Sequence, residues 1–374
     1  MHNKLVNLQS AFLNVPLVLA HKHKIRNSFK NYTANLTYDL SVYKNLFDRL
    51  DSEYCEEEAP LRSSLQEAII NSEGRKFMRI LDDSLTELGR IVGGFGREEH
   101  ECHGFYFRKQ LWNIILCSPF MARTNLKPRG YAGDSEMMAM LYENDYRGDS
   151  TFAKLMHKHP IEQPAAQAVR NRRSVIADMI CRLKGRQHKE AQRKWRILSV
   201  ACGPAREIQD IVRSEDDCRG YHFTLLDQDR TALYEAAKTV DETQRALGGK
   251  IAAAYLNESV RRMLSTPRLI SEWGQFHFVY SMGLFDYLTP PVAAAVAKKL
   301  YQLLKPGGEM VIGNFHVSNP SKYYMEYWHD WVLYYRRQED LKNLVKDASA
   351  DMDIFFDDTG VQMFLHVKKA PNGS

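Results

Sequence analysis

Two parts of the sequence combine residue types that can bind a ligand. Small residues dominate the run Val200-Ala-Cys-Gly-Pro-Ala205, and Asp227 lies 24 residues beyond Gly203 (227 − 203). Small side chains let a backbone approach a ligand closely, and a carboxylate at the tip of a strand can accept hydrogen bonds from both hydroxyls of a ribose. The structural alternative for Asp227 is the cap of a helix that begins before Thr231.

A polar loop is expected from Asn125 to Asp134, a stretch too rich in Pro and Gly for the interior of a helix or strand. Loops that carry charged and phenolic groups on a rigid scaffold are where binding residues concentrate. The alternative is a solvated turn in which Asp134 caps a helix that begins near Ser135. The loop supplies two cations, a phenol and a carboxylate: Lys127, Arg129, Tyr131 and Asp134.

Alternating strands and helices would hold these residues in place after residue 195. The apolar runs predict five strands, at 197–201, 221–226, 250–256, 276–280 and 309–315. Helical spacing at 208–212, 232–240 and 291–304 separates strands in a way typical of a parallel, doubly wound sheet, which binds ligands at the carboxyl ends of its strands. The helix after the first strand is expected from about Arg206, with its free N–H groups directed at the ligand.

The two ends of the chain show different patterns. Two apolar runs at 352–356 and 361–367 flank Asp357-Asp-Thr-Gly360, which predicts a closing hairpin. Residues 1 to about 155 instead show apolar residues at the three- and four-residue spacing of amphipathic helices. We therefore expect an all-helical domain over residues 1–190 and an α/β domain over residues 191–374.

The composition excludes several classes of protein. A net charge of +5, from 51 basic and 46 acidic residues, does not call for a nucleic acid or membrane partner. The six cysteines include no C-x-x-C pair, so neither a metal site nor a disulfide framework is expected, and a reducing compartment is indicated. The apolar run Phe12 to Ala20 is interrupted by Asn14 and is too short to span a membrane. The sequence thus predicts a soluble cytoplasmic protein and leaves its oligomeric state open.

Two further clusters have alternative interpretations. The arginines of Arg170-Asn-Arg-Arg173 either form a solvated helix face or include one that neutralises a ligand carboxylate. Five aromatic residues at helical spacing either belong to a core or line a substrate wall: Tyr323, Tyr324, Tyr327, Trp328 and Trp331.

Together these motifs resemble the class I S-adenosylmethionine (SAM)-dependent methyltransferases, over roughly residues 190–370. The resemblance rests on the Cys-Gly-Pro turn after the first strand, Asp227, the turn Leu304-Lys-Pro-Gly-Gly308 and the closing hairpin. Dinucleotide dehydrogenases share the first half of this pattern but lack the last two features. The family has an acidic residue and three glycines at the first turn, where this chain has Ser199, Ala201, Gly203 and Ala205. Ser199 cannot supply the carboxylate.

The resemblance implies a Rossmann-like, seven-stranded sheet with an antiparallel last strand, SAM as cofactor, and an N-terminal helical cap or lid. Asn257 would then form a hydrogen bond with the adenine edge of SAM. The alternative is that Asn257 is an ordinary asparagine of a turn. The cofactor-binding residues would be Arg129, Tyr131, Gly133, Asp134, Arg172, Ala201, Cys202, Gly203, Pro204, Asp227, Gln228, Asn257, Ser281 and Gly283. The catalytic residues would be His316, Tyr131, Tyr287 and Asp286. His316 is the candidate general base, and its alternative is a histidine hydrogen-bonded to backbone.

The loop at 127–134 and the helix near Arg172 resemble a bacterial subgroup assigned to 3-hydroxy fatty acid methyl ester biosynthesis, close to the azetidine-2-carboxylate synthases. The leading hypothesis is methyl transfer from SAM to a carboxylate or hydroxyl of a small molecule by in-line displacement. The second is a cyclase or lyase that acts on SAM alone and releases methylthioadenosine. The third is a non-catalytic SAM-binding or interaction protein. No aromatic-basic platform for nucleic acid is visible.

Overall fold

A computed structural model describes residues 24–186, 194–346, 348 and 350–371. The run Phe12 to Ala20 and the linker residues 187–193 lie outside the described residues. The chain forms two units, each built from separate stretches of sequence. Of the described residues, a helical unit contains 24–133, Glu143–Gln163 and Ser321–Val332, and a sheet unit contains the others.

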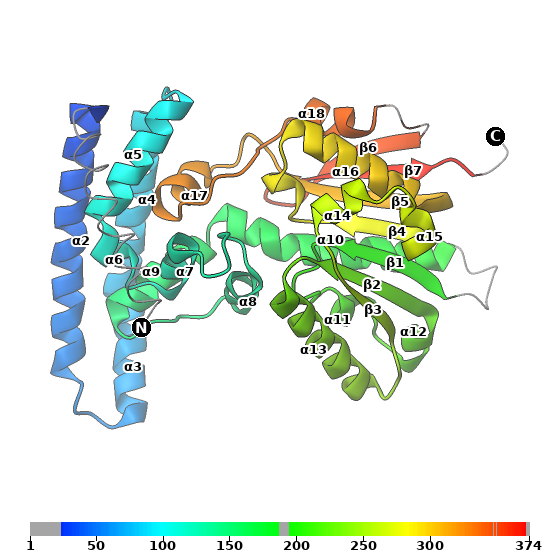
Figure 1. Cartoon of the computed structure of the whole chain (residues 1–374). Coiled ribbons are helices and arrows are strands. Elements are labelled where there is room, and N and C mark those ends of the chain that lie inside the picture. Colours follow the sequence, from blue (N-terminus) through cyan, green and yellow to red (C-terminus); the bar gives the residue numbers. More distant parts are fainter. Residues whose placement is uncertain (1–23, 187–193, 347, 349, 372–374) are drawn as a thin grey trace, which may run out of the picture. The chain divides into compact units, whose positions relative to one another are not determined.

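Seven strands form the one sheet of the second unit, in the order β3-β2-β1-β4-β5-β7-β6 (Figure 1). Strands β1 to β5 are parallel to their neighbours, whereas β7 is antiparallel to β5 and to β6. The expected α/β class, the seven-stranded sheet and the closing hairpin are confirmed. The strands are β1 (Trp195–Val200), β2 (Tyr221–Asp227), β3 (Ala252–Asn257), β4 (Phe276–Ser281), β5 (Leu304–Phe315), β6 (Ala350–Phe356) and β7 (Gln362–Lys369).

Helices cover both faces of this sheet (Figure 1). The helices assigned to the sheet unit are α8 (Ser135–Glu143, up to Tyr142), α10 (Pro164–Arg186), α11 (Ile208–Ile211), α12 (Glu215–Gly220), α13 (Arg230–Leu247), α14 (Val260–Ser265), α15 (Leu269–Trp273), α16 (Pro290–Gln302) and α18 (Gln338–Lys342), and α8 lies apart from the strands (Figure 1).

The central strand β1 shows why its sequence is apolar on both sides. Ile197 packs in one buried cluster with Ile176 of α10, whereas Leu198 packs in a second cluster with Val296 of α16. Successive residues of a strand point to opposite faces, so a strand covered on both faces needs apolar residues throughout. The same cluster shows why α10 belongs with the sheet. A single division between residues 190 and 191 therefore does not describe the two units.

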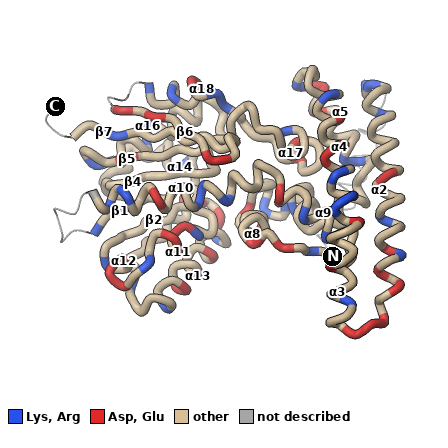
Figure 2. Tube along the Cα trace, turned by 180° about the vertical axis from the view of Figure 1, so that it is seen from behind, with Lys and Arg blue, Asp and Glu red and all other residues tan. Residues whose placement is uncertain are grey.

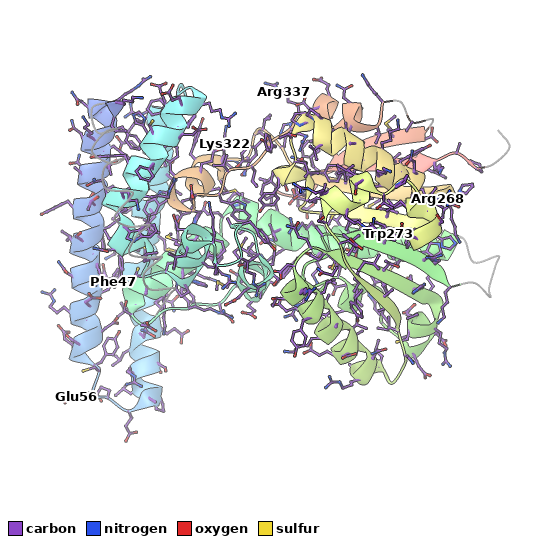
Figure 3. All side chains as sticks on the ribbon, viewed as in Figure 1. Phe47, Glu56, Arg268, Trp273, Lys322 and Arg337 are labelled. Carbon is purple, nitrogen blue, oxygen red and sulfur yellow. The ribbon has the colours of Figure 1, made fainter. Side chains whose placement is uncertain are left out.

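The helical unit has its own core. It contains α2 (Asn27–Glu53), α3 (Ala59–Ile69), α4 (Arg75–Val92), α5 (Arg97–Gln110), α6 (Trp112–Ile115), α7 (Pro119–Leu126), α9 (Thr151–Ile161) and α17 (Lys322–Trp328). Phe47 of α2, labelled in Figure 3, is fully buried and packs against Phe77 of α4. Tyr324, Tyr327 and Trp328 are buried in the same cluster, so these aromatic side chains belong to the core.

Two local expectations were wrong. The helix after β1 was expected from Arg206, but α11 comprises only Ile208–Ile211, so it offers little helix dipole. The turn expected at Lys305 to Gly308 lies inside β5, where Gly307 has a φ of +72° and the register with β4 shifts. A bulge, which a left-handed glycine permits, accounts for the difference.

Charges of both signs are interspersed along the described elements of each unit (Figure 2). Within the described ranges, no helix is long and apolar enough to cross a membrane.

Candidate functional site

The turn after β1 has an unusual backbone. Ala201, Gly203 and Ala205 have φ angles of +54°, +54° and +49°. A left-handed conformation costs a non-glycine residue about 1–2 kcal/mol, which explains why glycine is the expected residue at these positions. A Cβ added at Gly203 would have no atom within 4 Å, so open space borders the backbone there. Strain of this kind is often stored where a chain binds a ligand.

Asp227, the last residue of β2, joins the β1 turn to the tip of its own strand. Its Oδ2 accepts a hydrogen bond from the N–H of Gly203 at 3.0 Å, and its Oδ1 accepts one from the N–H of Asp229 at 2.9 Å. Burial raises the pKa of Asp227, and these two backbone donors oppose that effect. The helix cap is Asp229, whose carboxylate accepts from the N–H of Thr231, so Asp227 does not have the capping role. Each oxygen of Asp227 keeps acceptor capacity for a ligand.

Asn257, the last residue of β3, is exposed, and its side-chain amide already forms hydrogen bonds within the protein. Its Nδ2 donates to the carbonyl oxygens of Asp227 and Gln228 at 3.1 and 3.0 Å, and its Oδ1 accepts from Nε of Arg230. Both amide hydrogens therefore hold the neighbouring loop, as the turn alternative requires. Gln228 itself is exposed beside Asp227.

Arg172 of α10 lies at the carboxyl end of β4. Its Nη1 donates to the carbonyl of Met282 at 3.4 Å, and its Nη2 lies 3.2 Å from Sδ of Met138. A Cβ added at Gly283 would lie only 3.3 Å from Nη1, so glycine permits this close approach. Ser281 is fully buried and donates to the carbonyl of Val200, which ties β4 to β1. The structure thus brings these predicted residues together.

The turn after β4 is held by buried charges. The Asp286 carboxylate is 3% exposed and accepts from the N–H of Phe315 at 2.8 Å. Burial raises its pKa to about 7, opposed by that N–H and by the charges of Arg172 and Arg336. Arg336 donates to the carbonyls of Phe285 and Leu288 at 2.7 and 2.6 Å and to Oδ1 of Asn314.

No pattern in the sequence pointed to Arg336. Its partners are mainly backbone carbonyls, which carry no sequence signal. Tyr287, next to Asp286, is 38% exposed.

His316 directly follows β5 and is partly exposed. Its Nδ1 lies 2.7 Å from the hydroxyl of Ser318, and its ring meets the edge of Phe356 at a centroid distance of 5.2 Å. Its main side-chain partner is therefore a hydroxyl, since the backbone N–H of Ser318 is farther away, at 3.4 Å.

A second residue that was not expected from the sequence is Glu207, between the β1 turn and α11. Its Oε1 accepts from the hydroxyl of Tyr280 at 2.6 Å, and burial raises its pKa. An acidic residue four positions after Gly203 was the available signal.

The predicted loop at 127–134 divides between the two units. Arg129, Tyr131 and Gly133 belong to the helical unit, whereas Asp134 belongs to the sheet unit. Asp134 is fully buried, and its Oδ1 accepts from the N–H of Met137 at 2.9 Å, as the helix-cap alternative predicted for α8.

One surface cavity of the sheet unit lies away from these residues. It measures about 120 Å³ and is lined by Arg268, Leu269 and Lys299, among others. The residues that line the cavity come shortly before β4, which follows Trp273, and directly before β5 (Figure 3). The cavity therefore lies near the amino ends of these two strands. Ligands of doubly wound sheets bind at the opposite ends.

Comparison with known proteins finds similarity in structure alone. No protein-family model matches the sequence, and no curated protein matches it. A solved structure described as a possible exported protein from Bordetella parapertussis has 16% identity, covers 76% of this chain and 95% of its own, and gives a TM-score of 0.51. An O-methyltransferase family protein from Burkholderia thailandensis has 14% identity over 93% of this chain and 96% of its own, with a TM-score of 0.44. Magnesium protoporphyrin IX methyltransferase from Synechocystis, with bound S-adenosylhomocysteine (SAH), has 10% identity over 55% and 87%, with a TM-score of 0.40. At these identities, the similarity to the Bordetella protein is one of fold.

Proposed function

We propose that this chain is a SAM-dependent methyltransferase that acts on a small molecule with a carboxylate or hydroxyl acceptor. One observation carries the proposal: at the carboxyl ends of β1 and β2, the Asp227 carboxylate is bonded to the strained turn at Gly203. A nucleoside binds at this place in a doubly wound sheet.

The residues present fit the nucleoside part of SAM. Open space borders the backbone at Gly203, and Asp227 retains acceptor capacity for two ribose hydroxyls. Cys202 and Pro204 are buried parts of the same turn, whereas Ala201 is partly exposed. The turn would therefore provide a close-fitting wall of backbone, and Asp227 would orient the sugar.

The acceptor side would lie at β4 and β5. Bound SAM supplies a methyl group that is already activated on a sulfonium, so the protein has mainly to orient the acceptor and exclude water. His316 would remove the proton of a hydroxyl acceptor, a step that a carboxylate acceptor does not need. The exposed Tyr287 would line the acceptor pocket, and the buried Asp286 would position the turn beside it. Arg129, Tyr131 and Gly133 would belong to the helical lid.

Product analysis tests the proposal. The purified protein is incubated with SAM and a panel of small carboxylic acids and hydroxyl compounds, and the nucleoside products are identified by mass spectrometry. We expect SAH, formed only when an acceptor is present. Methylthioadenosine formed from SAM alone would instead identify a cyclase or lyase. A protein that does not bind SAH in calorimetry would be a non-catalytic interaction protein.

A variant separates the acceptor types. His316→Ala should lower kcat for a hydroxyl acceptor by about 10²–10⁴-fold and leave kcat for a carboxylate acceptor near the wild-type value. Equal losses with both acceptors would contradict the role of His316 as a base.

All six cysteines are free thiols. This supports a reducing compartment, and the cytoplasm is the location that accompanies the proposed function.

A further inference from the structure

The cavity at the amino ends of β4 and β5 is lined by cations and by no carboxylate. It measures about 120 Å³ and is formed by the start of α15, the residues just before it and the end of α16, all within the sheet unit. Its polar lining residues are Arg268, Ser271, Lys299 and Gln302. The cavity therefore presents two positive charges and a side-chain amide to a molecule that enters it.

Both cations keep donors for a ligand. Nζ of Lys299 donates to the carbonyl of Thr266 at 2.9 Å, and an ammonium group has two further hydrogens. Arg268 is exposed (Figure 3), and in the part of the chain that the structure describes its guanidinium forms no hydrogen bond or ion pair. Glu272, the acidic residue of α15, is paired with Arg262 at 3.2 Å. The charge of Glu272 is thus already balanced.

Further basic groups lie at the same end of the sheet. Nη2 of Arg196, in β1, donates to the carbonyl of Trp273, the last residue of α15, at 2.9 Å. The backbone N–H of Arg196 donates to Nδ1 of His277 at 2.8 Å, and Nζ of Lys305 lies 2.9 Å from Nε2 of the same ring. Burial and the charges of Lys305 and Arg196 lower the pKa of His277 to about 4. These charges add to the positive potential beside the cavity.

We propose that this cavity binds the phosphoryl group of a small anionic molecule. Arg268 and Lys299 neutralise its charge, and the amide of Gln302 donates to a third oxygen. A phosphoryl group offers three acceptor oxygens to these three donors, whereas a carboxylate offers two. Asp227 ends β2 at the opposite edge of the parallel strands, so this site is separate from the proposed SAM site and does not rest on the proposed function.

Calorimetry at constant ionic strength tests the assignment with inorganic phosphate, pyrophosphate and ribose 5-phosphate, and with acetate as the carboxylate. We expect saturable binding of the phosphate-bearing probes and weaker binding of acetate. Arg268→Gln and Lys299→Met should each weaken phosphate binding at least about 10-fold, because each removes a charge-assisted hydrogen bond. Tighter binding of ribose 5-phosphate than of inorganic phosphate would identify a phosphorylated metabolite as the ligand, and equal affinities would identify the free anion.

Lys298→Met is the matched control, because Lys298 is exposed, precedes Lys299 in α16 and does not line the cavity. It changes the net charge by the same amount and should bind phosphate as the wild type does. Thermal unfolding checks that each variant is folded, and Arg268→Gln, at an exposed side chain, gives the comparison if Lys299→Met is not.

Three results would overturn the site. They are a wild-type protein that binds no phosphate-bearing probe saturably, acetate binding as tight as phosphate binding, and equal weakening in Lys298→Met and Lys299→Met. SAH binding is measured in the same variants and should not change. A failure of this site therefore leaves the proposed function standing, and a protein that binds phosphate but not SAH overturns the proposed function alone.

Discussion

The turns after β1 and β4 lie at the same edge of the sheet but are stabilised in different ways. The first is shaped by its own backbone, with three left-handed residues and an Asp227 carboxylate bonded to the N–H of Gly203. The second is held by charged side chains: Asp286 of the turn itself, and Arg172 and Arg336 from distant segments. A turn of the first kind is visible in a short stretch of sequence, whereas a turn of the second kind depends on the whole fold.

Removal of Arg336 should have the largest effect, because it leaves several buried acceptors unpaired. Arg336→Met should lower the free energy of unfolding by about 3–5 kcal/mol. Urea denaturation measures the change. The neighbouring Arg337, labelled in Figure 3, is exposed. Arg337→Met should therefore change the free energy of unfolding by no more than about 0.5 kcal/mol. Similar effects of the two variants would show that charges do not hold the β4 turn.

The titration of Asp286 should appear in the pH dependence of stability. Its pKa is about 7 in the folded protein, against an ordinary value of 3.8. Between about pH 4 and pH 7 the folded state binds more protons than the unfolded state, so this group's contribution to stability is lost as the pH rises. The loss is on the order of 4 kcal/mol. Asp286→Asn should remove it, and urea denaturation at pH 5 and pH 8 would show this. If the stabilities of the wild type and of Asp286→Asn changed equally between pH 5 and pH 8, Asp286 would not be the group that causes the change.

The β1 turn should respond to substitution mainly in ligand binding. Asp227→Ala should weaken SAH binding by about 10–150-fold, because a carboxylate–hydroxyl hydrogen bond contributes about 1.5–3 kcal/mol. Calorimetry gives the dissociation constant. Asp229→Ala removes the cap of α13 and should lower stability by about 1 kcal/mol, with SAH affinity unchanged. Equal effects of the two variants on SAH affinity would assign the Asp227 effect to the fold.

The smallest effect on stability is expected when the backbone strain of the β1 turn is relieved by substitution. Ala201 is partly exposed and has a φ of +54°, so glycine relieves strain there with little loss of packing. Ala201→Gly should raise the free energy of unfolding by about 0.5–1 kcal/mol, after the entropy cost of glycine is deducted. Thermal unfolding measures the gain, and a destabilised variant would show that the turn is not strained.

The sequence alone determined the strands, their parallel arrangement and the place of the β1 turn and Asp227. Each rests on a local pattern: an apolar run, a small-residue turn, or a carboxylate where a strand ends. The same local patterns overestimated the helix after the turn, because the spacing of apolar residues does not reveal where a helix starts.

Only the tertiary structure revealed the polar groups that complete the site. Glu207 meets Tyr280 across 73 positions, and Arg336 meets Phe285 across 51. It also placed α10 with the sheet and residues 321–332 with the N-terminal helices. The physical reason is the same in each case. A hydrogen bond to a backbone carbonyl or a distant phenol leaves no periodicity in the sequence, and folding alone brings the partners together.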